Sequence, residues 1–239
     1  MASSARPILC AVLDVAALGG GRERCRDAAL RLFDGGVDWI QLRDRRVEGL
    51  VLLEAAEGLV AARDAVPRDP ESPCRVIVNR RADVALAAGA DGVHLGFDAL
   101  VPDSARLLLG AQAWLGVSLH APGEVDSAAR QRSGDDPDPP PGPPIDYVHL
   151  APIWDPRSKP ARRPALGLAA LEQACVAGIA VLAQGGLDAD RAVQAVAAGA
   201  AGIAVTGRLS QAEDPAAVAR RLREALDSTA EPLDRRERQ

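Results

Sequence analysis

An eightfold alternation of apolar strands with helical segments is the feature that most restricts how this chain can fold. Strand-like runs are expected at 7–15, 38–44, 74–79, 91–96, 113–120, 145–152, 179–186 and 201–207. Helical patterns are expected at 22–36, 48–65, 81–90, 103–110, 121–132, 167–178, 188–200 and 214–228. Eight such units in 239 residues predict an α/β protein with a single-domain (β/α)8 TIM barrel over residues 1–228, with a doubly wound open sheet as the alternative.

Composition supports one large globular domain. The chain is 48% hydrophobic, which is enough for a sizeable core, and its net charge of −5 argues against nucleic acid as a partner. No apolar run reaches the roughly 20 residues of a membrane span, and the first residues lack a signal-peptide layout. The four cysteines form no CxxC pair, so free thiols and a cytoplasmic location are expected.

Two segments fall outside the strand–helix pattern. Residues 133–144 read "SGDDPDPPPGPP", a low-complexity insertion that cannot hold regular structure. It follows the fifth helix, and loops after helices lie at the end of a barrel away from the active site. The tail at 229–239 is expected to be disordered.

Polar residues stand where strands are expected to end, at the mouth of the barrel. Gln41 and Arg43 share one face of their strand by two-residue alternation, as do Ser118 and His120. Asn79 and Arg80 follow a third strand. Histidine titrates near neutral pH, so His120 at a strand end is the best acid/base candidate in the sequence.

Each of these residues also has a structural reading. Arg43 could be an ion-pair partner, and Arg80 could face solvent or support helix packing. His94 and His149 lie within strands, where hydrogen-bonded interior roles are expected.

The last strands carry features typical of a phosphate site. Gly185 and Gly186 follow the seventh strand, and Thr206 and Gly207 follow the eighth, where barrels often bind phosphate through backbone N–H groups. Lys159, the only lysine of the chain, lies in the loop after the sixth strand. It is either an ammonium ligand for an anion or a chance survivor in an arginine-rich chain.

Six ordered segments resemble the thiamine phosphate synthase/TenI superfamily. They are "WIQLRDR", "VNRRADVALAAGADGVHLG", "GVSLH", "DYVHLAPIWDPRSKP", "LAQGG" and "AGIAVTG". The resemblance runs from about residue 8 to about residue 226, and it implies a TIM barrel that binds thiazole phosphates. It implies no nucleic-acid or membrane partner and leaves a homo-oligomer open.

The superfamily holds two activities, and the residues that separate them are visible here. The synthase joins a pyrimidine pyrophosphate to thiazole phosphate with Mg²⁺ held by aspartates, one directly after the strand 3 asparagine. In this chain Arg80 follows Asn79, and Phe97-Asp98-Ala99 replaces the second acidic pattern. Arg45 stands where the synthase has a lysine. An arginine at a ligand position repels Mg²⁺.

The TenI branch needs no metal and carries Asn-x-Arg after strand 3, which Asn79-Arg80-Arg81 matches. The resemblance therefore implies a cofactor-free thiazole tautomerase, an isomerase, with His120 as general acid/base. The residues expected to bind substrate are Gln41, Arg43, Asn79, Arg80 and Ser118, and those expected to bind phosphate are Lys159, Gly185, Gly186, Thr206 and Gly207. The alternatives are a divergent, magnesium-dependent synthase and a non-catalytic ligand-binding barrel.

Overall fold

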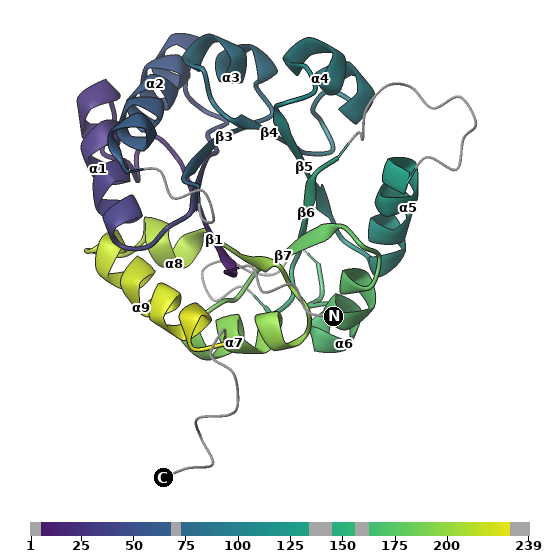
Figure 1. Ribbon diagram of the computed structural model, residues 1–239. Coiled ribbons are helices and arrows are strands. Elements are labelled where there is room, and N and C mark those ends of the chain that lie inside the picture. The colour runs from purple at the N-terminus through teal and green to yellow at the C-terminus, as the bar shows by residue number, and fades with distance from the viewer. Residues whose placement is uncertain (1–5, 68–72, 134–144, 156–162, 230–239) are drawn as a thin grey trace.

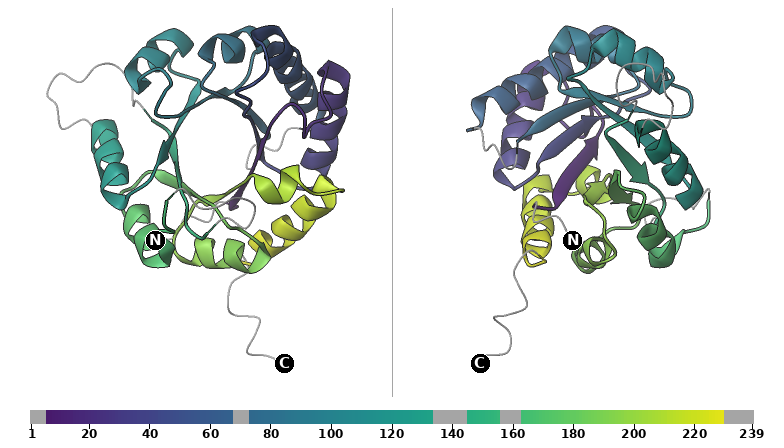
Figure 2. Two further views of the ribbon diagram at one scale, coloured as in Figure 1. Left: turned by 180° about the vertical axis from the view of Figure 1, so that it is seen from behind. Right: turned by 45° about the vertical axis from the view of Figure 1, so that its right-hand side comes forward.

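Eight parallel strands close into a barrel in the order of the sequence, β1 to β8, and helices surround it (Figures 1 and 2). The structure, a computed structural model, describes residues 6–67, 73–133, 145–155 and 163–229. The strands are β1 Ile8–Leu13, β2 Trp39–Leu42, β3 Arg75–Asn79, β4 Gly92–Leu95, β5 Trp114–Leu119, β6 Tyr147–Leu150, β7 Ala180–Gln184 and β8 Gly202–Val205. The predicted TIM barrel is confirmed, and the open sheet is excluded by the pairing of β1 with β8.

Every predicted helix is present, and one short helix was not predicted. The helices are α1 Arg22–Asp34, α2 Gly49–Ala65, α3 Ala82–Ala88, α4 Pro102–Leu109, α5 Pro122–Ser133, α6 Gly167–Cys175, α7 Ala189–Ala197, α8 Gly207–Ser210 and α9 Pro215–Asp227. Helix α8 has four residues, too few to give a periodic pattern. The predicted insertion and tail lie outside the described residues except for their first residues. No helix in the described part of the chain combines the length and apolarity that crossing a bilayer would require.

Alternation along the strands divides the apolar side chains into two clusters. Leu9, Ala11 and Leu13 of β1 join the large cluster between barrel and helices. Cys10 and Val12, on the other face, belong to a separate cluster inside the barrel. Because strand side chains alternate, each strand contributes to both layers, and the interior positions nearest the carboxyl ends are free to carry polar groups.

Aromatic rings fill the barrel interior near the amino-terminal ends of the strands. The Trp39 ring lies 5.4 Å from Trp114 and 5.0 Å from Tyr147, centroid to centroid, with edge-to-face geometry. The guanidinium of Arg75 stacks 4.0 Å from the centre of the Trp114 ring. A Cβ atom at Gly116 would overlap the Tyr147 ring, so the large ring depends on this glycine opposite it.

A recurrent carboxylate joins strands at their amino-terminal ends. An aspartate directly before β2, β4 or β6 accepts the backbone N–H of the preceding strand and pairs with an arginine. Asp38 accepts from Leu9 N–H at 2.7 Å and pairs with Arg223 at 3.0 Å. Asp91 accepts from Val76 N–H at 2.7 Å and pairs with Arg63 at 2.7 Å. Asp146 accepts from Leu115 N–H at 2.8 Å and pairs with Arg106 at 2.9 Å. Each carboxylate therefore ties two strands and one helix together.

Gly116→Ala should lower the free energy of unfolding by about 1–3 kcal/mol, the usual cost of overpacking a core. The added methyl group would collide with Tyr147. Gly123→Ala is the matched control, because a Cβ there meets nothing within 4 Å. Urea unfolding of both variants measures the effect, and equal stability of the two would contradict this packing.

Candidate active site

A layer of buried polar side chains forms the floor of the barrel mouth. Gln41, Asn79, His94 and His149 are all at most 6% exposed, each near the carboxyl end of its strand. The Gln41 Nε2 amide donates to Asn79 Oδ1 at 3.2 Å. Gln41 Oε1 has no hydrogen-bond partner among the described residues. A buried acceptor without a partner is costly, so it marks a place where a ligand donor would fit.

Two histidines lie side by side in this floor. Their ring centroids are 4.2 Å apart, and His94 Nε2 lies 2.8 Å from the Ser118 hydroxyl while Nδ1 lies 3.3 Å from the Tyr147 hydroxyl. Burial lowers the pKa of His149 to about 3. Burial, with the nearby His149 and Arg43, also lowers the pKa of His94 well below its usual value. Both rings are therefore neutral at pH 7, and the interior position predicted for them is confirmed. The predicted hydrogen bonds are present for His94, whereas His149 Nε2 has no partner among the described residues.

His120 follows β5 and is only partly buried. Its Nδ1 atom lies 2.7 Å from the carbonyl oxygen of Ala151, and its backbone N–H donates to Glu124 at 2.6 Å. A carbonyl only accepts, so Nδ1 carries a hydrogen atom. The other ring nitrogen, Nε2, is left without a partner among the described residues and is available to a ligand.

Arginines gather beside the ends of β2 and β3. Arg80 NH1 pairs with Asp98 Oδ2 at 2.9 Å, and Arg45 NH2 lies 3.7 Å from Asp98 Oδ1. Arg43 has no side-chain ion pair or hydrogen bond within the described ranges. Partial burial, then the charges of Arg45 and Arg80, lower the pKa of Arg43, while Asp98 raises it. The three guanidinium groups are thus electrostatic neighbours around one carboxylate.

Across the barrel, glycines line the ends of β7 and β8. Gly185 and Gly186 have φ angles of 100° and 65°, which favour glycine. Outside the helices and strands, none of the hydrogen bonds between described residues uses their N–H groups. Gln184 Nε2 donates to Thr206 Oγ1 at 3.3 Å, and Gly207 begins α8. Lys159 lies outside the described residues.

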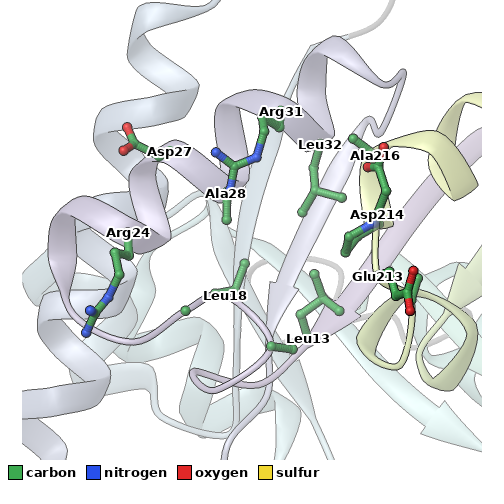
Figure 3. Close-up of a pocket in the computed structure, with 14 residues that line it drawn as sticks. Leu13, Leu18, Arg24, Asp27, Ala28, Arg31, Leu32, Glu213, Asp214 and Ala216 are labelled. Atoms are coloured by element: carbon green, nitrogen blue, oxygen red, sulfur yellow. The ribbon is translucent and has the colours of Figure 1, made fainter.

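A separate cavity of about 390 Å³ lies beside the β1–α1 loop, between α1 and the start of α9 (Figure 3). Leu13, Leu18 and Leu32 contribute apolar walls, and Arg31 and Glu213 are among its charged lining residues. None of the predicted site residues lines this cavity.

Comparison with known proteins identifies the family. The family described as "Thiamine monophosphate synthase" matches residues 9–209. The chain belongs to the thiamine monophosphate synthase family. A protein named "Thiamine-phosphate synthase" from Mycobacterium sp. (strain JLS) is 37% identical over 206 residues, covering 84% of each chain. Another so named, from Methanoculleus marisnigri, is 38% identical over 210 residues, covering 87% of this chain and 90% of its own.

A solved structure supports the fold. The thiamine phosphate pyrophosphorylase from Pyrococcus furiosus superposes with a TM-score of 0.73 and 24% sequence identity, over 93% of this chain and 96% of its own. At that identity the likeness is one of fold.

The expectation of a TenI-type tautomerase, an isomerase, is wrong. Relatives of the thiamine monophosphate synthase family at 34–38% identity over most of the chain are named synthases. That expectation rested on Arg81 as the arginine of the Asn-x-Arg pattern, and the contacts of Arg81 explain why the pattern was misleading. Its guanidinium pairs with Asp83 of α3 at 2.6 Å and is 42% exposed, so it is already engaged beside the first turn of a helix. The proton shuttle predicted for His120 belonged to that reaction and loses its basis.

The magnesium site of the synthases is not matched by the residues present. Mg²⁺ requires near-octahedral oxygen ligands, and Arg80 occupies the first expected aspartate position. Asp98, the remaining carboxylate, is engaged by Arg80 and Arg45. Within the described ranges, no group of three or more His, Cys, Asp or Glu side chains is placed to hold a metal ion.

The sequence did not predict the contacts that Asp98 and Tyr147 make in the candidate site, with Arg80 and His94 respectively. Nothing in the sequence indicated that Arg80 would pair with Asp98, because the two residues are 18 positions apart. Tyr147 shares the inward face of β6 with His149, two residues away, and that alternation was the signal available.

The buried histidines predict a loss of stability in mild acid. Their pKa values are lowered on folding, so below about pH 6.5 the unfolded chain takes up protons that the folded protein does not. Stability should therefore fall from pH 6.5 towards pH 3, by roughly 1 kcal/mol per pH unit for each histidine between pH 6 and pH 5. Urea unfolding across this range should show a shallower pH slope for His149→Gln, and an unchanged slope would contradict the neutral buried state.

Proposed function

We propose that this chain is a transferase of the thiamine-phosphate synthase type, joining a pyrimidine carried on diphosphate to a thiazole phosphate. The observation that carries the proposal is a pair of anion-compatible regions on opposite sides of one mouth. In a closed eight-strand order, β3 lies across the barrel from β7. Arginines stand at the β2–β3 side, and at the β7 side are glycine N–H groups that donate to no described residue. The names of the relatives favour the same reaction.

The reaction suits a site with two anion positions and a neutral floor between them. The bond between the pyrimidine methylene carbon and the diphosphate oxygen breaks, and diphosphate leaves with the electron pair. The thiazole ring nitrogen donates its lone pair to that carbon and becomes positively charged. No proton has to leave either ring in this step, so a general base is not required.

Roles for the side chains follow from where they lie. Gln41, Asn79 and Ser118, in the floor, orient the pyrimidine ring through hydrogen bonds. His120 presents Nε2 at the rim as a further hydrogen-bonding group. We assign the thiazole phosphate to the β7–β8 side, where the residues proposed to bind it are Gly185, Gly186, Thr206 and Gly207. Lys159 lies outside the described residues and is proposed as a phosphate ligand from the sequence alone.

A coupling assay tests the proposal. The purified protein, given hydroxymethylpyrimidine diphosphate and thiazole phosphate, should form thiamine phosphate and inorganic pyrophosphate in equal amounts. Chromatography and an enzymatic pyrophosphate assay measure the two products. If both compounds bind and neither product forms over a range of buffer and metal conditions, the transferase assignment is wrong.

His120→Gln distinguishes orientation from proton transfer. Loss of one hydrogen bond should reduce kcat/KM by about 2- to 10-fold, because such a bond contributes about 0.5–1.5 kcal/mol. A general acid–base group would instead account for about 10²–10⁴-fold. Steady-state kinetics of the variant and the wild type decide between them, and a loss above about 100-fold would contradict the orienting role.

A further inference from the structure

The carboxyl ends of β2 and β3 carry more positive charge than the protein itself neutralises. The guanidinium groups of Arg80 and Arg45 lie 2.9 and 3.7 Å from the single carboxylate of Asp98, and the charges of Arg45, Arg80 and Asp98 all act on Arg43. Two of them pair with it, and Arg43 pairs with no described residue. These three guanidinium groups and one carboxylate have a net charge of +2, and Arg43 and Arg45 are exposed, so an incoming anion can reach them.

Arg80 has a backbone conformation that directs its side chain into this cluster. Its φ of 68° makes it the one non-glycine residue with positive φ in the described part of the chain. Its N–H donates to His94 O at 2.9 Å, and the next N–H, that of Arg81, returns to Asn79 O at 2.8 Å. Residues held in this sparsely populated region are concentrated at ligand sites. The turn places the Arg80 guanidinium within 2.9 Å of Asp98.

From these contacts, and resting on the proposed function for the identity of the anion, we infer that Arg80, together with Arg43 and Arg45, binds the substrate diphosphate directly and takes the place of a divalent cation. Asp98 is a substitute anion that holds Arg80 and Arg45 until diphosphate displaces it. Diphosphate offers several oxygens and more negative charge than one carboxylate, and guanidinium groups bind such oxygens in bidentate geometry.

The same arrangement supplies what the transfer step requires. As the carbon–oxygen bond breaks, negative charge accumulates on the departing diphosphate. Fixed guanidinium charges stabilise that charge without any further ligand exchange. A carboxylate at position 80 would need a metal ion for this purpose, whereas an arginine there supplies the positive charge itself.

Isothermal calorimetry with inorganic pyrophosphate tests the inference on the full chain. Wild-type protein in EDTA should bind pyrophosphate, and added Mg²⁺ should not strengthen the binding. Arg80→Gln should weaken the binding in EDTA by at least about 10-fold, the scale of a lost charged hydrogen bond. Arg81→Gln removes the same charge one residue away, at a side chain that faces Asp83, and should leave the affinity unchanged.

The Asp98→Asn variant should change pyrophosphate affinity in opposite directions for an arginine site and for a magnesium site. If Asp98 competes with diphosphate, its loss should tighten pyrophosphate binding in EDTA by several-fold, because it frees Arg80 and Arg45. If Asp98 is a magnesium ligand, its loss should weaken Mg²⁺-dependent binding. Absence of binding in EDTA, or weakening by Asp98→Asn, overturns the inference.

These outcomes are separable from those of the coupling assay. Coupling that requires Mg²⁺, with no pyrophosphate binding in EDTA, would leave the transferase assignment intact and refute the arginine site. Metal-free pyrophosphate binding lost in Arg80→Gln, without any coupling, would support the arginine site and refute the transferase assignment. Circular dichroism of each variant confirms that a lost affinity does not reflect unfolding.

Discussion

The interaction on which the rest of this barrel depends is the pairing of a buried or partly buried carboxylate with a strand N–H and a helix arginine. Asp38, Asp91 and Asp146 repeat it before every second strand through β6. Each pairing fixes the register between two strands at their amino-terminal ends. Since parallel strands rise together, that register also decides which side chains are level at the carboxyl ends. Asn79 and His94, and likewise Ser118 and His149, are register partners in strand pairs that are joined in this way at the opposite end of the barrel.

Much of the fold was readable from the sequence because its signals are local. Period-two alternation and glycine-ended helices predicted all eight strands in order. Helix α8 escaped because four residues cannot display a helical period. Alternation placed Gln41 and Arg43 on one face of their strand without deciding which face points inward. The pairing of His94 with Tyr147 spans 53 residues and depends on closure of the barrel.

The site was harder to predict because its chemistry depends on pairs that are distant in sequence. Reading Arg80 and Arg81 together led to a metal-free isomerase, and that reaction is contradicted by the relatives. In the fold the two arginines diverge: Arg80, with a positive φ angle, pairs with Asp98, and Arg81 pairs with Asp83. The direction of the Arg80 side chain could not be predicted from local backbone propensity, because the left-handed conformation is unfavourable for an arginine in isolation. What the arginine at position 80 brings to the fold is an ion pair with Asp98, a residue 18 positions away.

Backbone hydrogen bonds join the beginning and the end of the segment that connects β6 to α6. The Leu166 N–H donates to Pro152 O at 2.9 Å, and the Gly167 N–H donates to Ile153 O at 3.0 Å. Ile153 in turn donates to Gln184 O of β7 at 2.8 Å. Both ends of the segment are thus fastened before residue 156 and after residue 162. Closure of the barrel between β6 and β7 is therefore supported by backbone hydrogen bonds of Ile153, Leu166 and Gly167, which flank residues 156–162.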